Sequence, residues 1–441
     1  MEPDASLPVV VIGAGPVGLA AAAHLLERGL EPLVLEAGDG PGAAIRAWGH
    51  IRLFSTWRYN IDAAARRLLE HDGGWDAPRE TRLPYGTELV DDYLAPLAAL
   101  PELRGRIRYG NRVTGVVRGE SGFLVRHDGG GSPGHDDGGG LPARAVIDAS
   151  GTWDTPNPAG GAGLPAVGES AARAAGLVTG PLPDVPGADA GRFAGRTVLV
   201  LGSGHSAANT LLSLGRVRQK HPETRILWAI RRPADPARLY GGGTADQLPA
   251  RGQLGASLRR FVENGDIELV DSFATARLDV VREGAVEGTP TGNAERAKPL
   301  RVTAADGRTL AVDVVVPCTG FRPDLAPLAG LRLDLDEAVQ APRGLGPLID
   351  PEFHSCGTVP AHGERLLAHP EPAFYIAGMK SYGRAPTFLM ATGYEQVRSL
   401  AAALAGDRAG ADRLQLDLPQ TGACSTDSGG SAGRPAGSVA G

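Results

Sequence analysis

The feature that most constrains this chain is a pattern that it contains twice: a short β-branched strand, a glycine-rich turn, an apolar helix and a second strand. In the first copy, the strand at residues 9–12 ends at Gly13, and Gly15 and Gly18 complete a Gly-x-Gly-x-x-Gly spacing. The next strand closes on Glu36. This order of elements predicts a βαβ unit of the Rossmann type, in which two parallel strands flank one helix.

Each part of the first copy has a physical role in binding a dinucleotide. Gly13 permits the tight turn, Gly15 lets the backbone approach a diphosphate, and Gly18 lets the helix pack closely on the strand. The helix N-terminus attracts phosphate charge, and Glu36 can accept hydrogen bonds from ribose hydroxyls. Glycine-rich turns also serve ordinary connections. Because the strands, the helix and the terminal acid are all present, we predict a dinucleotide site.

The second copy has the same architecture and a different ending. Gly202 and Gly204 form the turn, Ser206 follows, and a small alanine takes the third glycine position. The second strand closes on Arg231 and Arg232 instead of an acid. Two guanidinium groups suit a 2′-phosphate, so this site is predicted to prefer NADPH to NADH. The alternative is that both arginines are merely solvated at a strand end.

Two further segments resemble the FAD-binding part of a known superfamily. Residues 148–152, which include Gly151, and residues 317–321, which include Gly320, look like the two Ala-Thr-Gly-type crossings between its domains. Together with the acid-ended first site, they make the chain resemble the disulfide-reductase and flavin-monooxygenase superfamily over nearly its whole length. The resemblance implies FAD in the first site and an FAD domain split by an inserted NADPH domain.

The predicted fold is therefore α/β, with two Rossmann-type domains and the FAD domain split by the NADPH domain. A Gly-, Pro- and Ala-rich stretch at residues 156–195 is interpreted as a boundary, since the second copy begins straight after it. The predicted parts are residues 1–160 and 312–415 for the FAD domain, 190–311 for the NADPH domain, and 416–441 for a disordered tail of small and polar residues.

Within the superfamily, the chain most resembles flavin-containing monooxygenases, whose NADPH site typically has the form Gly-x-Gly-x-Ser-Ala. It departs from them in two places. The Phe-x-Gly-x-x-x-His signature is absent before the second turn. The late FAD element, which contains Gly378, continues with Met379 and Lys380 where the family has Gly-Asp, so contacts to the ribityl chain must come from elsewhere.

Residues 46–57 and 378–388 resemble a small branch of these enzymes that is associated with arsenic-resistance operons. That resemblance implies oxidation of a soft trivalent arsenical or of a sulfur centre.

The segment that follows the first site is expected to pass near the flavin ring. Its candidates for the flavin surroundings, and for catalysis, are Arg46, His50, Ser55 and Trp57. For His50 and Trp57 the alternative is core packing or an ordinary hydrogen bond.

Another candidate, Thr387, precedes with Phe388 a helix predicted at about residues 393–404. The dipole at the N-terminus of this helix would stabilise negative charge on a reduced flavin. An ordinary loop is the alternative explanation for both residues.

Charge and composition argue against a nucleic-acid-binding protein and against a membrane protein. The 441 residues carry a net charge of −6, with acidic and basic residues mixed, so no cationic surface for nucleic acid is predicted. The apolar stretch from Val9 is interrupted by glycines before it could span a membrane, and the N-terminus lacks the basic region of a signal peptide. We expect a cytoplasmic protein without membrane partners.

The number and spacing of the cysteines indicate whether the chain forms disulfides or uses a reactive thiol. Cys318, Cys356 and Cys424 are too few and too scattered for a disulfide framework, and none forms a Cys-x-x-Cys pair. Cys318 lies at an apolar strand end and is expected to pack. Cys356 and Cys424 could capture a thiophilic substrate, although free cysteines without a catalytic role are the commoner case. No metal site is predicted.

The resemblance implies a single-component monooxygenase acting on a small-molecule substrate and molecular oxygen. NADPH would reduce FAD, and a flavin hydroperoxide would pass one oxygen atom to a nucleophilic S, N or As centre. The alternative is an NADPH-dependent flavoprotein reductase that passes electrons to another acceptor. A dithiol relay is disfavoured because no Cys-x-x-Cys pair exists. A third hypothesis is a catalytically idle sensor that retains FAD without turning over NADPH.

Overall fold

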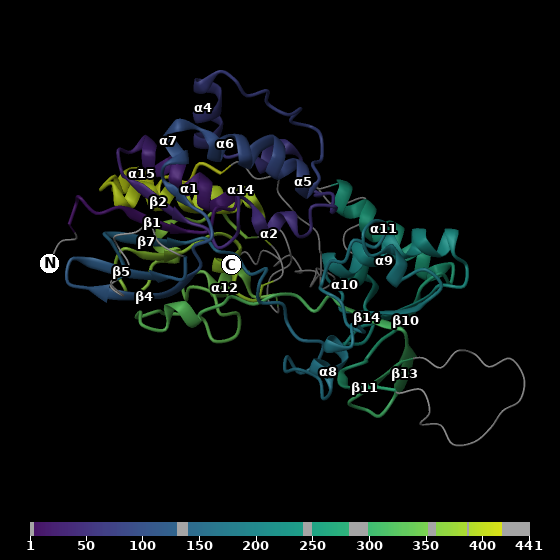
Figure 1. The fold of residues 1–441 in the computed structure, drawn as a ribbon. Coiled ribbons are helices and arrows are strands. Elements are labelled where there is room, and N and C mark those ends of the chain that lie inside the picture. The colour runs from purple at the N-terminus through teal and green to yellow at the C-terminus, as the bar shows by residue number, and fades with distance from the viewer. Residues whose placement is uncertain are drawn as a thin grey trace, which may run out of the picture.

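A computed structural model describes residues 4–129, 140–240, 249–281, 299–351, 359–385 and 388–416. Within these ranges the strands form one five-stranded, one four-stranded and two three-stranded sheets. Figure 1 shows the five-stranded sheet and its helices on one side of the molecule, and the four-stranded sheet with α9 and α11 on the other. Apart from its first residue, the tail predicted at residues 416–441 lies outside the described residues.

The first sheet has the strand order β15-β7-β1-β2-β3, and all of its pairs are parallel. Its strands are β1 (Val9–Ile12), β2 (Pro32–Leu35), β3 (Ile107–Arg108), β7 (Ala145–Asp148) and β15 (Phe374–Ile376). Most are short runs of β-branched and other apolar residues buried on both faces, as parallel strands usually are. In the register, Ile12 and Ile376 both lie opposite Asp148, so segments distant in sequence end at one edge of the sheet.

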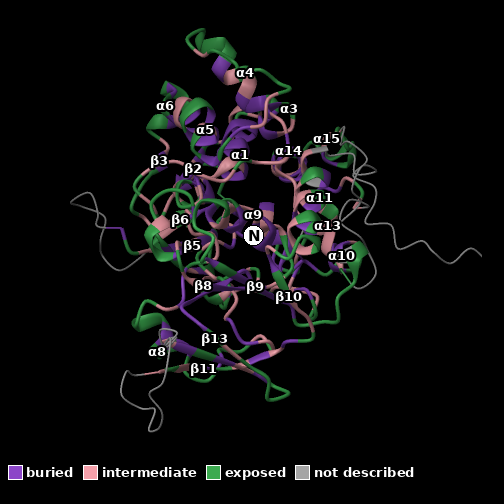
Figure 2. Cartoon of the chain, turned by 90° about the vertical axis from the view of Figure 1, so that its right-hand side faces the viewer, coloured by how far each residue is buried: buried purple, intermediate pink, exposed green. Residues whose placement is uncertain are grey.

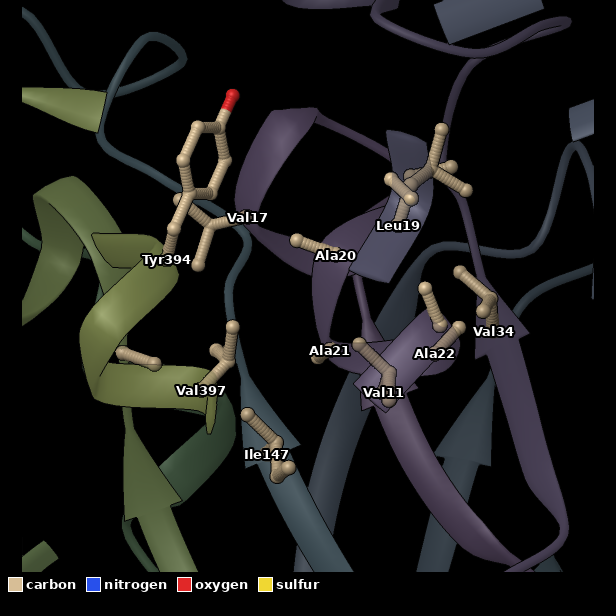
Figure 3. Close-up of a cluster of buried hydrophobic side chains, with 14 of the residues drawn as sticks. Val11, Val17, Leu19, Ala20, Ala21, Ala22, Val34, Ile147, Tyr394 and Val397 are labelled. Atoms are coloured by element: carbon tan, nitrogen blue, oxygen red, sulfur yellow. The ribbon is translucent and has the colours of Figure 1, made fainter. Parts of the chain in front are cut away.

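Helices α1 (Pro16–Glu27) and α14 (Met390–Leu404) cover one face of this sheet, and α4 (Ala63–Asp72) packs against α1. Residues 20–23 of α1 are alanines with no exposed surface, and these small side chains allow close packing. Figure 3 shows Val17 of α1 beside Tyr394 and Val397 of α14. The helix predicted at about residues 393–404 therefore exists and begins three residues earlier, at Met390.

The other face of the first sheet is covered by an antiparallel sheet of β4 (Val113–Gly119), β5 (Gly122–His127) and β6 (Leu141–Ala143). Val116, Val125 and Phe374 are among the buried residues of the core between the two sheets.

The second sheet repeats the first with the parallel order β10-β9-β8-β14. Its elements are β8 (Thr197–Leu201), α9 (His205–Lys220), β9 (Arg225–Ala229), α11 (Pro249–Glu263), β10 (Glu268–Val270) and β14 (Val314–Pro317). Every residue of β8 is buried, whereas the far end of α4 is exposed (Figure 2). The predicted α/β fold with two Rossmann-type units is confirmed.

The structure adds detail at two of the predicted boundaries. Strand β14 pairs with β8, so the second sheet continues past the boundary expected at residue 311 and ends after Pro317. The stretch at residues 156–195, interpreted as a boundary, contains α8 (Glu169–Ala174) and packs against β11 (Thr275–Val280), where the amide of Val167 donates to the carbonyl of Ala276.

The fourth sheet is antiparallel and consists of β11, β12 (Leu300–Ala304) and β13 (Thr309–Val312). The shorter helical elements are α2 (Ala43–Arg46), α3 (Trp57–Asn60), α5 (Gly86–Leu89), η1 (Val90–Leu94), α6 (Ala95–Ala99), α7 (Pro101–Arg104), η2 (Ala190–Arg192), α10 (Pro236–Tyr240), η4 (Ala326–Leu328), α12 (Gly346–Ile349), α13 (Glu364–Leu367), η5 (Gly378–Tyr382) and α15 (Arg408–Asp412). Among the described residues, no helix combines the length and the apolar character needed to cross a membrane.

Candidate functional site

The first glycine turn joins β1 to α1 and has room for an anion. Gly13 has φ +99°, and a Cβ on Gly18 would overlap the carbonyl oxygen of Gly13, so both positions require glycine. A Cβ on Gly15 would meet nothing within 4 Å, so open space lies at the start of the helix. Helix α1 has no side-chain cap and no acid in its first turn. Its first amides are therefore available to a diphosphate.

Glu36 lies beside this turn, directly after β2. Its Oε2 accepts a hydrogen bond from the amide of Ala14 at 2.7 Å, and its Oε1 accepts one from the amide of Gly38 at 2.7 Å. The carboxylate is thereby fixed next to the diphosphate position, where ribose hydroxyls could donate to its remaining lone pairs. Gly13, Gly15, Gly18 and Glu36 together fit the diphosphate and adenosine ribose of FAD.

The second glycine turn has the same construction. Gly202 has φ +112°, and a Cβ there would overlap the carbonyl of Cys318, whereas a Cβ on Gly204 would meet nothing within 4 Å. Helix α9 starts at the next residue and has neither a side-chain cap nor an acid in its first turn. Ser206 lies in this first turn and is partly exposed. A second dinucleotide diphosphate fits here.

Arg231 and Arg232 follow β9 and are both exposed. The Nη1 of Arg231 donates to the carbonyl of Gly161 at 3.0 Å, and the carbonyl of Arg232 accepts from the amide of Ser272. Gly161 also lines a cavity of about 340 Å³ whose other residues are mostly small and apolar, including Ala274 and neighbouring glycines. The guanidinium of Arg231 thus lies at an open edge of the second sheet, where a 2′-phosphate could be bound.

The two segments that resemble domain crossings lie side by side. Gly151 has φ +73° and Gly320 has φ +88°. Asn157 lies five residues after the first segment and was not singled out by sequence analysis. It binds the second segment: its amide donates to Gly320 O at 2.9 Å, and its Nδ2 donates to Thr319 O at 3.1 Å. Sequence analysis missed this role because an asparagine in a Pro- and Gly-rich stretch is equally typical of a turn.

A contact between aromatic rings joins the two sites. Phe54 belongs to the segment that follows the first βαβ unit, and His205 is the first residue of α9, directly after the second glycine turn. Their ring centroids are 5.2 Å apart. The segment expected to pass near the flavin therefore reaches the N-terminus of the helix that would bind the second dinucleotide.

A family model described as FAD dependent oxidoreductase matches residues 8–99, which include the first glycine turn and Glu36. The protein is an FAD-dependent oxidoreductase. No curated protein matches its sequence.

The oxidoreductase shares its fold with solved two-dinucleotide-binding flavoproteins. Bacillithiol disulfide reductase Bdr from Bacillus cereus is 20% identical, with a TM-score of 0.62 over 91% of this chain and 99% of that one. A mutant flavin monooxygenase from Stenotrophomonas maltophilia is 23% identical, with a TM-score of 0.57 over 91% and 98%. The thioredoxin reductase of T. acidophilum is 16% identical, with a TM-score of 0.54 over 92% and 99%. These similarities establish the fold.

The structure gives the flavin-side candidates of the oxidoreductase different surroundings. Arg46 forms an ion pair with Asp91 at 2.9 Å, and its side chain is 46% exposed. Ser55 donates to Asn60 Oδ1 at 2.8 Å within the buried core. Neither residue is therefore a free polar group that awaits a ligand.

His50 and Trp57 differ from these two. Trp57 has no exposed surface, and both its Nε1 and the Nε2 of His50 are buried without a hydrogen-bond partner. Buried polar atoms without a hydrogen-bond partner are uncommon, so these two atoms are exceptions within the described residues.

The region before α14 contains Thr387, which was predicted to lie near the flavin. Thr387 lies outside the described residues. Phe388 packs edge-on against Tyr382, with ring centroids 5.2 Å apart. Gly378 has φ +68°, and its amide donates to Gln396 Oε1 at 2.8 Å. Gln396 was missed because its partner lies 18 residues earlier, in a turn whose shape the sequence pattern does not define.

Tyr394, which was also missed, links α14 to the segment that contains Ser55. Its hydroxyl donates to the carbonyl of Asn60 at 2.7 Å, and burial raises its pKa well above the ordinary value. The phenol stays protonated at physiological pH and serves as a hydrogen-bond donor. The interaction fixes the segment that contains Ser55 and Asn60 to α14.

Cys318 packs as expected. It is buried, its thiol lies 3.3 Å from the carbonyl of Pro181, and burial raises its pKa to about 12. A neutral, covered thiol is a poor nucleophile. Cys356 and Cys424 lie outside the described residues. Within the described part of the chain, no three His, Cys, Asp or Glu side chains gather as a metal site would require.

Proposed function

We propose that the protein is an FAD- and NADPH-dependent monooxygenase that oxygenates a soft nucleophilic S, N or As centre of a small molecule. The contact between Phe54 and His205 is the observation that carries this proposal. It brings the segment beside the FAD site to the second glycine turn, so a nicotinamide held at the second site has the flavin within reach in the same chain.

The residues of the two turns have distinct tasks in this function. The amides at the start of α1 bind the FAD diphosphate, and Glu36 accepts from the adenosine ribose. The amides at the start of α9 bind the NADPH diphosphate, and Arg231 and Arg232 bind the 2′-phosphate. When bound, FAD supplies the capacity to accept a hydride and, once reduced, to react with oxygen.

The chain itself contributes position and exclusion of water. Phe54 contacts His205 and Phe388 packs against Tyr382, and both apolar rings are expected near the flavin edge. Apolar walls protect a reactive reduced cofactor from water. In the overall reaction, NADPH, a proton, O₂ and the substrate yield NADP⁺, water and the oxygenated substrate.

The thiol content supports oxygen, rather than a disulfide, as the electron acceptor. The chain has three cysteines and no Cys-x-x-Cys pair. Cys318 is buried, and its pKa is raised to about 12 by burial, so it is unsuited to thiol exchange.

The second candidate function is an NADPH-dependent reductase with another acceptor. It is favoured by the likeness in fold to a bacillithiol disulfide reductase and a thioredoxin reductase. Reduction of a quinone or of a small protein fits the same two dinucleotide sites.

A coupled assay separates the two functions. Oxygen uptake, NADPH oxidation and peroxide release are followed with the purified yellow protein, with and without thioethers and trivalent arsenicals. We expect one O₂ and one NADPH consumed for each oxygenated product, with little peroxide. NADPH oxidation that requires an artificial electron acceptor, with no oxygen incorporated, would overturn the proposal in favour of the reductase. Bound FAD with negligible NADPH oxidation would identify a sensor instead.

A further inference from the structure

Lys380 is one of only three lysines among the 44 basic residues of this chain, the others being Lys220 and Lys298. Its side chain is 3% exposed, and its Nζ lies 2.6 Å from Asp148 Oδ2. A chain that otherwise uses arginine almost everywhere has here a compact ammonium, which fits a confined site better than a planar guanidinium does.

The partner of Lys380 is held just as tightly. Asp148 ends β7, is 1% exposed, and uses its other oxygen, Oδ1, to accept from the amide of Ser150 at 3.1 Å and from its hydroxyl at 2.7 Å. The Nζ of Lys380 also donates to the hydroxyl of Ser150 at 3.1 Å. Burying two charges is costly unless such hydrogen bonds satisfy them, so the pair is retained for what it holds in place.

The residue held in place is exposed. Ser150 is exposed, although its amide and hydroxyl are both hydrogen-bonded to buried charged groups. It lies against the first glycine turn, because a Cβ on Gly13 would meet the Cα of Ser150 at 3.1 Å and the carbonyl oxygen of Ala149 at 3.0 Å. A rigid, open residue beside a diphosphate-binding turn forms a wall of that site.

The turn that contains Lys380 is itself fixed in place by its neighbours. It lies in η5, the turn whose Gly378 amide is bound by Gln396, and Ser381 Oγ donates to the carbonyl of Gly378 at 2.7 Å. The turn is therefore fixed to α14 on one side and, through Lys380, to the end of β7 on the other. Met379 stands where a carboxylate is expected in this element.

We propose that Lys380 and Asp148 are positioning residues for FAD: their buried ion pair fixes Ser150 and Ala149 against the Gly13 turn and so shapes the wall of the FAD site. Neither charge touches the cofactor. The pair acts by holding the loop after β7 in the one arrangement that matches the bound dinucleotide.

The test compares Lys380→Met, Asp148→Asn and the double variant that combines them. FAD is removed, and the FAD dissociation constant of each refolded apoprotein is measured by flavin fluorescence, with the visible circular dichroism of the bound flavin as a second readout. The melting temperature of each apoprotein is measured separately. The matched control is Glu371→Gln, which breaks a different ion pair, that of Arg118 with a 3% exposed carboxylate.

Each single variant should raise the FAD dissociation constant about tenfold or more and change the circular dichroism of the flavin. The double variant should bind FAD better than either single variant, because it leaves no unpaired buried charge. Glu371→Gln should lower the melting temperature while its dissociation constant stays within about twofold of the wild type.

If Lys380→Met and Asp148→Asn lower only the melting temperature and bind FAD like the control, the pair is merely structural and the proposal fails. A single variant too unstable to refold is replaced by the double variant, whose unchanged affinity and unchanged flavin spectrum would equally overturn it. The binding assay uses neither NADPH nor oxygen, so its outcome is independent of whether the protein proves to be a monooxygenase.

Discussion

The ring of Phe54 lies against the ring of His205, at a centroid distance of 5.2 Å, and this contact connects the segment after the first dinucleotide unit with the first residue of α9 in the second. The two residues are 151 positions apart in the sequence. Under the proposed function, this contact makes the approach of NADPH to FAD dependent on side chains from both units.

Replacing either ring should slow the transfer of hydride between the cofactors. We expect Phe54→Ala to lower the rate of FAD reduction by NADPH about tenfold, because small displacements of the reacting groups are costly, while FAD content stays unchanged. Stopped-flow absorbance at the flavin band measures this rate. His205→Ala should have a similar effect, and the double variant should be little worse than either single one. Fully additive losses would show that the two rings act separately.

The Glu36 carboxylate should contribute to FAD affinity. Glu36→Ala removes the acceptor of the Ala14 and Gly38 amides and of the ribose hydroxyls, so we expect a rise in the FAD dissociation constant of about tenfold or more. Equilibrium dialysis with fluorescence detection measures it. Glu120→Ala, an exposed residue next to β4, is the matched control and should bind FAD normally. Equal affinities of the two variants would remove Glu36 from the site.

Arg231 and Arg232 should determine the choice of nicotinamide cofactor. Replacing both by Gln should lower the preference for NADPH over NADH about tenfold or more in kcat/KM, since each loses charge-assisted hydrogen bonds to the 2′-phosphate. Steady-state rates with both cofactors give the ratio. Arg225 lies at the opposite end of β9, so Arg225→Gln should leave the ratio of the two kcat/KM values unchanged. A ratio that is insensitive to the double change would mean that the arginines are only solvated.

His362 should make the stability of the protein fall in mild acid. Burial lowers the pKa of His362 from its ordinary value of 6.5, while Nδ1 lies 3.0 Å from the carbonyl of Pro360 and Nε2 lies 2.9 Å from Gln396 Nε2. The unfolded chain therefore takes up the proton first. The stabilising contribution of the neutral ring is complete above about pH 6.5 and is lost as the pH falls toward the lower pKa of the folded state.

Melting temperatures between about pH 5 and 8 test this prediction. The loss of stability in acid should be smaller in His362→Gln than in the wild type. Part of it should remain, because burial also lowers the pKa of His369. An identical pH dependence in the two proteins would show that His362 does not titrate on unfolding.

Cys318 should be chemically inert. Because burial raises its pKa to about 12, its thiol stays protonated at pH 8 and should not react with iodoacetamide in the folded protein. Peptide mass spectrometry of the alkylated protein identifies the modified cysteines. Cys318→Ala should retain activity within about twofold. Rapid labelling of Cys318, or loss of turnover in this variant, would favour the reductase function.

The elements that the sequence predicted are those determined by neighbouring residues. The turn at Gly13 and the turn at Gly202 each lie within one short βαβ stretch, and both have the positive φ that the glycines anticipate. The parallel order of the strands follows from the same units, as does the position of Glu36 at the end of a strand.

The details that sequence analysis missed depend on contacts between distant parts of the chain. Lys380 and Asp148 are 232 residues apart, and Tyr394 and Asn60 are 334 apart. One sequence contains no sign of such pairs. The place of Ser55 near the flavin stays a prediction, and its hydroxyl donates to Asn60, a buried neighbour that the local pattern did not reveal.

The place of β15 in the first sheet determines which of the two units is completed first during translation. Strand β15 begins at Phe374 and pairs with β7, which ends at Asp148, while the whole second sheet lies between them in sequence. On the ribosome, the second unit is complete once Pro317 has emerged, when the earlier strands of the first unit still lack their edge partner and α14. The first unit to be synthesised is thus the last to close, and FAD can meet its finished site only near the end of translation.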